Sequence, residues 1–161
     1  MTQSEFKTLF DQHFDAVRNY IWYRSGDGEL ASDIAQEVFL KLWEKQNRIH
    51  NKNHKALLFK MAGDLFVNHY RKSKLKLKFK ISAPDEPHVN TPEDNFHFED
   101  LKLRYEQSLS QLPDKQRVVF LMSRIDHMKY SEIAQTLEIS QKAVEKRMNQ
   151  ALKFLRKALN P

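Results

Sequence analysis

The residues best suited to recognition chemistry lie near the carboxyl end, on one face of a predicted helix. Lys142, Lys146, Asn149 and Lys153 recur at three- and four-residue steps after Ser140. This spacing places cations and an amide on the same side of a helix. Such groups can bind phosphates and donate hydrogen bonds to base edges. The alternative interpretation is that these lysines form a hydrated helix face that binds no partner.

The stretch 130–155 reads as two short helices joined by a tight turn, and it positions those cations. Ser131 is expected to cap the first helix and Ser140 the second. Ile139 is expected to fill the corner between them. Apolar residues at helical spacing form the inner faces: Ile133, Ala134 and Leu137, then Val144, Met148, Ala151, Leu152 and Leu155. The pattern is typical of a helix-turn-helix that inserts its second helix into the major groove of DNA, although an ordinary helical hairpin shares it.

Other kinds of chemistry find no support in the sequence. There is no Cys, so neither a disulfide framework nor a thiol nucleophile is predicted. The seven His are not arranged in a metal-binding spacing such as HExxH, and there is no glycine-rich phosphate loop and no Gly-x-Ser-x-Gly motif. We therefore predict no catalytic site, no metal and no cofactor.

Composition and charge indicate a helical protein in two parts. Of 161 residues 40% are hydrophobic and only three are Gly, which favours an all-α fold. Net charge is −1 over 1–54, +7 over 55–80, −6 over 81–100 and +6 over 101–161. Two basic zones separated by an acidic one suggest a polyanion held at two places, while solvated faces and an acidic loop are the plainer reading.

The acidic zone predicts the domain boundaries. It contains Pro84, Pro87 and Pro92 and no cation, a composition typical of a flexible linker. We expect two small helical domains, 1–80 and 101–161, joined by the linker 81–100. A helix is expected to resume at Phe98 and end before Leu112, and the next to have Pro113 in its first turn.

The amino-terminal part predicts helices over 4–24 and 30–46. In the second, Asp33, Gln36, Glu37 and Glu44 lie opposite the apolar face, with Leu40 among them. A large apolar side chain surrounded by polar ones can be a small docking face for another protein. A single exposed Leu is also common without any function, and the pattern alone slightly favours that second interpretation.

A polar loop, 47–54, and a third helix, 55–74, complete this part. On the helix, Lys60, Asp64, Val67, Arg71 and Lys74 are expected to face outward, with Phe66 and Tyr70 beside them. Cations next to aromatic rings suit unpaired nucleotides, but either ring could equally pack on a neighbouring helix. The segment 74–81 alternates Lys with apolar residues and is compatible with a strand, a basic helix or, less well, a membrane surface.

The sequence contains no apolar run of membrane-spanning length. The amino terminus is amphipathic, with Glu5 and Asp11, and does not read as a signal peptide. We expect a soluble cytoplasmic protein without membrane insertion.

Three segments resemble, in order, regions of bacterial RNA polymerase sigma factors of the sigma-70 family. ASDIAQEVFLKLW resembles the region that docks on core polymerase, and LLFKMAGDLFVNHYRK the region that melts and reads the minus-ten element. The stretch from Leu109 to Lys157 resembles the region that reads the minus-thirty-five element. The two-domain layout is similar to that of the extracytoplasmic-function (ECF) group.

The resemblance implies roles for individual residues. Asp33, Gln36, Glu37 and Leu40 would face the clamp helices of the polymerase. The loop Arg48–His54, including Asn51 and Lys52, would hold a flipped base. The other implied DNA contacts are Asn68, Arg71 and Lys72 at the minus-ten strand, and Gln141, Lys142, Glu145, Lys146 and Arg147 at the minus-thirty-five element. A cognate anti-sigma factor is also implied.

Some positions depart from the family pattern. The family often has Asn where this chain has Asp64, and Asp where it has Asn68. Its turn usually holds Gly where Glu138 stands, and Glu145 replaces a typical Lys. A left-handed backbone at Glu138 would cost about 1 kcal/mol. The prediction is a non-enzymatic sigma factor; the alternative is a stand-alone helix-turn-helix regulator, against which the 31–43 segment argues.

Overall fold

The computed structural model describes residues 1–48, 53–73 and 92–160. Within these ranges the regular elements are all helical, as predicted. Their bounds are α1 (Gln3–Ser25), α2 (Gly28–Glu44), η1 (Gln46–Arg48), α3 (His54–Ser73), α4 (Pro92–Gln111), α5 (Asp114–Arg124), α6 (Tyr130–Leu137) and α7 (Gln141–Leu159). The predicted basic segment 74–81 and the first part of the predicted linker lie outside the described residues.

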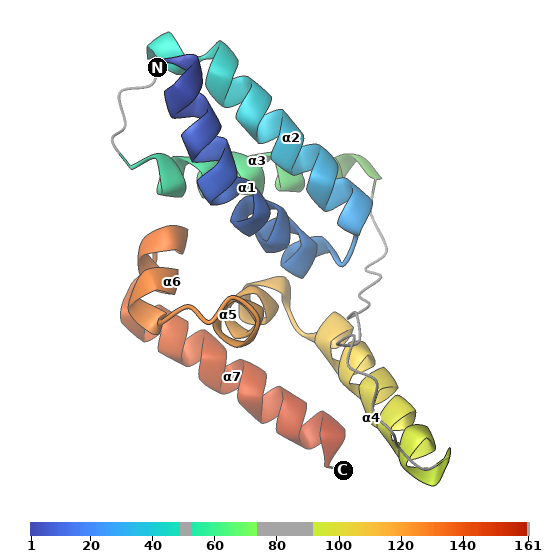
Figure 1. Cartoon of the computed structure of the whole chain (residues 1–161). Coiled ribbons are helices and arrows are strands. Elements are labelled where there is room, and N and C mark those ends of the chain that lie inside the picture. Colours follow the sequence, from blue (N-terminus) through green and yellow to red (C-terminus); the bar gives the residue numbers. More distant parts are fainter. Residues whose placement is uncertain (49–52, 74–91, 161) are drawn as a thin grey trace.

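Helices α1, α2 and α3 form one bundle, and α4 to α7 form a second (Figure 1). In the first, α1 and α2 make the most extensive contact, and α3 packs across both. In the second, α7 packs against α4, α5 and α6. We call these the amino-terminal bundle and the carboxy-terminal bundle.

The helix ends of the amino-terminal bundle follow from local sequence. Thr2 and Glu5 form a reciprocal capping box at the start of α1. Gly26 ends α1 with φ 69°, a left-handed conformation that glycine adopts without steric cost. Asp27 then caps α2, its carboxylate accepting from the backbone N–H groups of Glu29 and Leu30. The second helix therefore begins two residues before the predicted Leu30.

The boundary of α4 corrects one prediction. The helix begins at Pro92, six residues before the predicted Phe98, so residues 92–100 of the expected linker are helical. Pro suits a helix start because its missing N–H lacks an intrahelical partner there in any case. By contrast, Pro113 is the N-cap of α5 and lies one position before the helix that it was expected to open.

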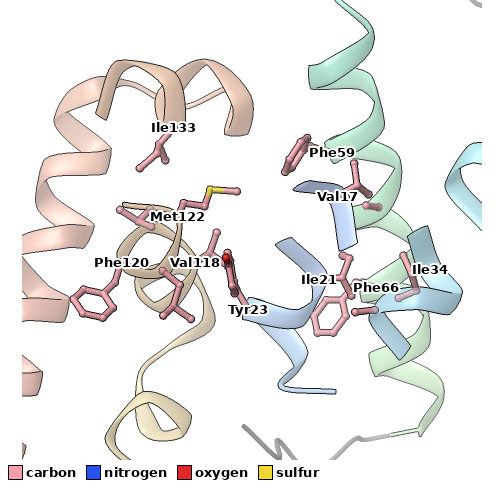
Figure 2. Packing of buried hydrophobic residues seen from close by; sticks show 14 of the residues in the cluster. Val17, Ile21, Tyr23, Ile34, Phe59, Phe66, Val118, Phe120, Met122 and Ile133 are labelled. Carbon is pink, nitrogen blue, oxygen red and sulfur yellow. The ribbon is translucent and has the colours of Figure 1, made fainter. Parts of the chain in front are cut away.

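The two bundles are packed against each other through α1 with α5 and α3 with α6. Their buried residues form one continuous apolar cluster. Figure 2 shows Tyr23 of α1 between the amino-terminal group of Val17, Ile21 and Phe66 and the carboxy-terminal residues Val118 and Met122. The sequence alone left open how the two predicted domains are arranged, and the structure answers with a closed form.

Candidate functional site

The predicted recognition helix presents a polar outer face. In α7, Val144, Met148, Ala151 and Leu155 are buried, as the spacing predicts, whereas Leu152 of the same predicted face is half-buried. Gln141, Lys142, Glu145 and Lys146 are exposed and Arg147 is half-buried, so their placement suits a contact with DNA. The Ser140 hydroxyl accepts a hydrogen bond from the Ala143 backbone N–H at 3.0 Å, which confirms this cap.

The helix before the turn into α7 differs from expectation in its cap. The N-cap of α6 is Lys129, so the predicted cap Ser131 lies inside the first turn and is exposed. Glu138 ends α6 with φ 55° and ψ 44°, the left-handed conformation that glycine favours. Ile139 donates its backbone N–H to the Ala134 carbonyl at 3.0 Å and packs against the core, so the corner is closed as predicted.

The polar face of α2 surrounds an exposed leucine. Ile34, Ala35, Val38, Phe39 and Leu42 are buried on the inner side. On the outer side Leu40 is 56% exposed. Asp33 and Gln36 are exposed nearby, and Glu37 forms an ion pair with Lys41 at 3.2 Å. Trp43 lies edge-on to Phe6, with ring centroids 5.0 Å apart.

Leu40 thus projects from a helix whose opposite side is buried in the core. The packing of Trp43 against α1 extends the apolar area beside it.

The predicted minus-ten face is only partly described. Asn68 and Tyr70 are exposed on α3. Phe66 is instead buried, with the Arg24 guanidinium 4.5 Å from its ring centroid, so it packs and is not available for stacking on a base. Arg71 and Lys72 lie in the last turn of α3, although their side chains, like that of Arg48, are not described. Asn51 and Lys52 lie outside the described residues.

A cavity of about 300 Å³ lies where α3 packs against α6, and Tyr20 and Arg24 of α1 also line it. Lys60, Asp64 and Val67, which the sequence predicts to face outward, line one side of it. Thr136, Leu137 and Glu138 of α6 line the other side. Lys60 and Asp64 are nevertheless exposed, as predicted, and Val67 is half-buried.

Sequence reasoning missed the polar contacts between the bundles. Arg117 of α5 is 1% exposed and donates hydrogen bonds to four backbone carbonyls, two of them in α1. Burial lowers the pKa of Arg117 to about 10, which leaves it protonated at neutral pH. The sequence did contain one indication that Arg117 is buried. Arg117 precedes the apolar residue Leu121 by one helical turn and so lies on the core face of α5.

The described residues contain no group of three His, Cys, Asp or Glu side chains that could hold a metal ion. Among the described helices, none combines the length and the apolar character needed to cross a membrane.

Comparison with known proteins agrees with this arrangement. Residues 9–75 match the family described as Sigma-70 region 2, and residues 102–155 match Sigma-70, region 4. The chain belongs to the sigma-70 family, in its ECF group. This sigma factor is 26% identical to the ECF RNA polymerase sigma factor SigW of Bacillus subtilis, with 98% of this chain and 90% of that protein aligned.

Two further relatives extend the likeness. The ferric citrate uptake sigma factor FecI of Escherichia coli is 26% identical, over 91% of this chain and 86% of its own. The solved structure of the sigma factor RpoE in complex with the anti-sigma factor NepR, from Bartonella quintana, matches the fold with a TM-score of 0.66 at 20% identity and covers 96% of both chains. The predicted all-α class is thereby confirmed.

Proposed function

We propose that this protein is an ECF sigma factor that binds core RNA polymerase, directs it to a restricted set of promoters and helps to open the duplex. It has no catalytic activity of its own and acts in the cytoplasm, where the polymerase is. In this proposal residues 1–80 dock on polymerase and read the minus-ten element, 81–100 connect, and 101–161 read the minus-thirty-five element. Residues 92–100 of the connection are the first turns of α4.

The observation that supports the proposal is that an exposed Leu among polar side chains on α2 and an exposed polar, largely basic face on α7 occur together, on separate bundles. Leu40, with Asp33, Gln36 and Glu37, gives α2 a surface for a protein partner. Gln141, Lys142, Glu145 and Lys146 give α7 a surface for DNA. A stand-alone regulator would need only the second surface.

The remaining contacts are assigned by position on the family pattern. Asn68, Arg71 and Lys72 would grip the minus-ten strand, and Arg48, Asn51 and Lys52 would belong to the loop that holds a flipped base. Arg147, half-buried on α7, would reach the backbone of the minus-thirty-five element. A cognate anti-sigma factor is a further proposed partner, since the solved RpoE was captured with one.

Sequencing of transcripts made by core polymerase with and without this protein tests the function. We expect new 5′ ends that share upstream elements at two positions. The same protein should co-purify with core polymerase in the absence of DNA. DNA binding without co-purification and without new transcripts would support the stand-alone regulator instead.

The docking surface has a sharper test in Leu40→Asp. Losing a central apolar anchor costs about 2 kcal/mol or more, about thirtyfold in affinity. Leu103→Asp is the matched control, because Leu103 is 53% exposed on α4, in a different part of the molecule (Figure 1). Affinity for core polymerase should fall only in the first variant while both keep their helical circular dichroism. An unchanged affinity in folded Leu40→Asp protein would remove α2 from the docking surface.

A further inference from the structure

Arg18 of α1 connects that helix to the beginning of α2. Its Nε donates a hydrogen bond to the Ser32 hydroxyl at 2.8 Å, and its Nη2 donates to the Gly28 carbonyl at 3.4 Å. Both acceptors belong to α2, and Arg18 is half-buried. The donors of a guanidinium lie in a rigid planar fork, so binding two acceptors on one helix restricts the position of that helix.

The first turn of α2 depends on such polar contacts. None of the residues Gly28–Leu30 is buried, and the buried side of the helix starts at Ala31. The carboxylate of the N-cap Asp27 accepts hydrogen bonds from backbone N–H groups of this turn. Arg18 adds the second polar contact, from the neighbouring helix. A turn without buried side chains frays more easily when such contacts are lost.

Gly28 leaves the space that the Arg18 guanidinium occupies. A Cβ atom at position 28 would lie 3.3 Å from Arg18 Nη2, which is tighter than most contacts of a Cβ. The φ angle of Gly28 is not positive, unlike that of Gly26, so the backbone conformation does not itself require glycine. The absence of a side chain at position 28 therefore serves the contact with Arg18.

The turn held by Arg18 lies beneath the carboxylate of Asp33. Side chains on a helix tilt toward its amino end, so the side chain of Asp33 covers the turn before its own Cα. Arg18, Glu29 and Asp33 line one open hollow of about 720 Å³. Glu29 and Asp33 are one helical turn apart and repel each other, and the positive charge of Arg18 in the same hollow offsets that repulsion. Arg18 thus acts on the position of Asp33 in two ways.

We propose that Arg18 is a positioning residue of the docking face. It holds the first turn of α2, and with it the Asp33 carboxylate, in the arrangement that binds polymerase, without touching polymerase itself. The inference rests on the proposed function, because Asp33 is assigned to polymerase docking there. A binding surface that is ordered in advance loses less conformational freedom on association, so losing Arg18 weakens docking through Asp33.

The experiment measures the affinity of the full-length protein for core RNA polymerase in the absence of DNA. Arg18→Ala should bind about two- to thirtyfold more weakly, the range for residues that act on a site through others. Ser32→Ala should also weaken binding, although alanine is the better helix former. The matched control is Lys7→Ala, which removes an exposed cation from the same helix. The control should keep wild-type affinity, and all variants should keep their helical circular dichroism.

A double-mutant cycle separates positioning from a direct contact of Arg18 with polymerase. Arg18→Ala should have little further effect in a protein that already carries Asp33→Asn, because the group that Arg18 positions is then altered. In a protein that carries Leu40→Asp, Arg18→Ala should lower affinity by its full factor. Equal losses with and without Asp33→Asn would show that Arg18 does not act through Asp33 and would overturn the proposal.

Gly28→Ala displaces the guanidinium while leaving Arg18 in the protein. We expect about a twofold loss of affinity. The urea midpoint of unfolding should not fall, because alanine restricts the unfolded chain more than glycine does. The same substitution should change nothing in Arg18→Ala protein, where there is no guanidinium to displace. The control is Gly63→Ala in α3, where the added Cβ would meet its nearest atom, Tyr20 Oη, at an ordinary 3.4 Å.

The outcomes distinguish this inference from the proposed function. If Leu40→Asp loses affinity while Arg18→Ala and Gly28→Ala bind like wild type, the positioning role is overturned and the proposed docking face stands. If the wild-type protein does not bind core polymerase, the proposed function is overturned and this inference falls with it.

Discussion

Glu145 is an acidic side chain in the middle of a cationic reading face. It is exposed on α7 between Lys142 and Lys146, all within the first two turns after Ser140. A carboxylate there can accept a hydrogen bond from a cytosine amino group in the major groove. Phosphate contacts, by contrast, position a protein without specifying sequence. Glu145 is therefore expected to read a base and the more distant Lys153 to grip phosphate.

The affinity of the complete holoenzyme for single-base variants of the minus-thirty-five element, measured at two salt concentrations, distinguishes a base reader from a phosphate contact. Glu145→Ala should relax preference at one base pair by about 1–3 kcal/mol. Lys153→Ala should weaken binding about equally on all variants and lower the salt slope by up to about 1. A uniform effect of Glu145→Ala would mean that the helix docks in a different register.

Glu138 stores strain in the turn between α6 and α7. Its φ of 55° is unfavourable for any side chain with a Cβ, by roughly 1–2 kcal/mol. Glu138→Gly removes that strain but gives the unfolded chain more freedom, which offsets about half of the gain.

We therefore expect Glu138→Gly to raise the free energy of unfolding by about 0.5–1 kcal/mol in chemical denaturation. Gln135→Gly is the contrasting control, because Gln135 is exposed within α6, and it should lower stability by about 0.5–1 kcal/mol. If both variants lost stability equally, the left-handed turn would not be a source of strain.

At the scale of elements, capping residues fix where helices begin. Ser131 and Ser140 were both predicted to be N-caps, but only Ser140 is one. The Ser140 hydroxyl accepts from the Ala143 N–H, whereas Ser131 is the second residue of α6. Ser140→Ala should cost about 1 kcal/mol of unfolding free energy, and Ser140→Asp should retain most of it. Ser131→Ala should change stability by a few tenths of a kcal/mol at most. Thermal and urea unfolding of the three variants gives the comparison, and an equal loss at both serines would contradict the assignment.

The apolar spacing predicted the helices of this chain well, because each pattern is local. The predicted inner face of α2 is buried at every position, and that of α7 at every position except Leu152, which is half-buried. The start of α4 was missed because acidic residues after Pro92 read as linker composition, although a proline followed by Glu93 and Asp94 also suits the first turn of a helix.

Spacing places Arg117 on the core face of α5, but it could not reveal which residues Tyr23, Arg24 and Arg117 contact in the other bundle, because those partners are about 90 residues away. A Tyr or an Arg at the end of a helix looks the same whether it is hydrated or buried under another bundle. Sequence could identify the candidate surfaces on α2 and α7, whereas the packing of α6 against α3 required the tertiary arrangement.

At the scale of the whole molecule, the interface responds to pH through Asp126. Burial raises the pKa of this carboxyl above its usual value, and the hydrogen bond from Tyr23 opposes part of that rise. A raised pKa means that the folded protein binds this proton more tightly than the unfolded chain does. The contribution of Asp126 to stability is thus fully present below the unfolded pKa and is lost as pH rises through the folded one.

Asp126→Asn should make the folded protein more stable than wild type at pH 7, by roughly a few tenths of a kcal/mol once partial solvent screening is allowed for. The amide oxygen still accepts from Tyr23. The difference in unfolding free energy between the variant and wild type should shrink as pH falls and Asp126 becomes protonated. Urea unfolding measured between about pH 4 and pH 7 would show this, because carboxyl groups commonly titrate in or near that range. A variant that is less stable at pH 7, by an amount independent of pH, would contradict the assignment.

The capping of α1 by Arg117 also has a consequence for folding during synthesis of the chain. The bond from Arg117 to Tyr23 spans 94 residues, and that to Arg24 spans 93. At about 5–20 residues per second, a ribosome needs roughly 5–20 s to add that length. Throughout that interval the last carbonyls of α1 have only water as a partner. The end of α1 can therefore gain this cap only after Arg117 has left the ribosome, well after the amino-terminal bundle has been made.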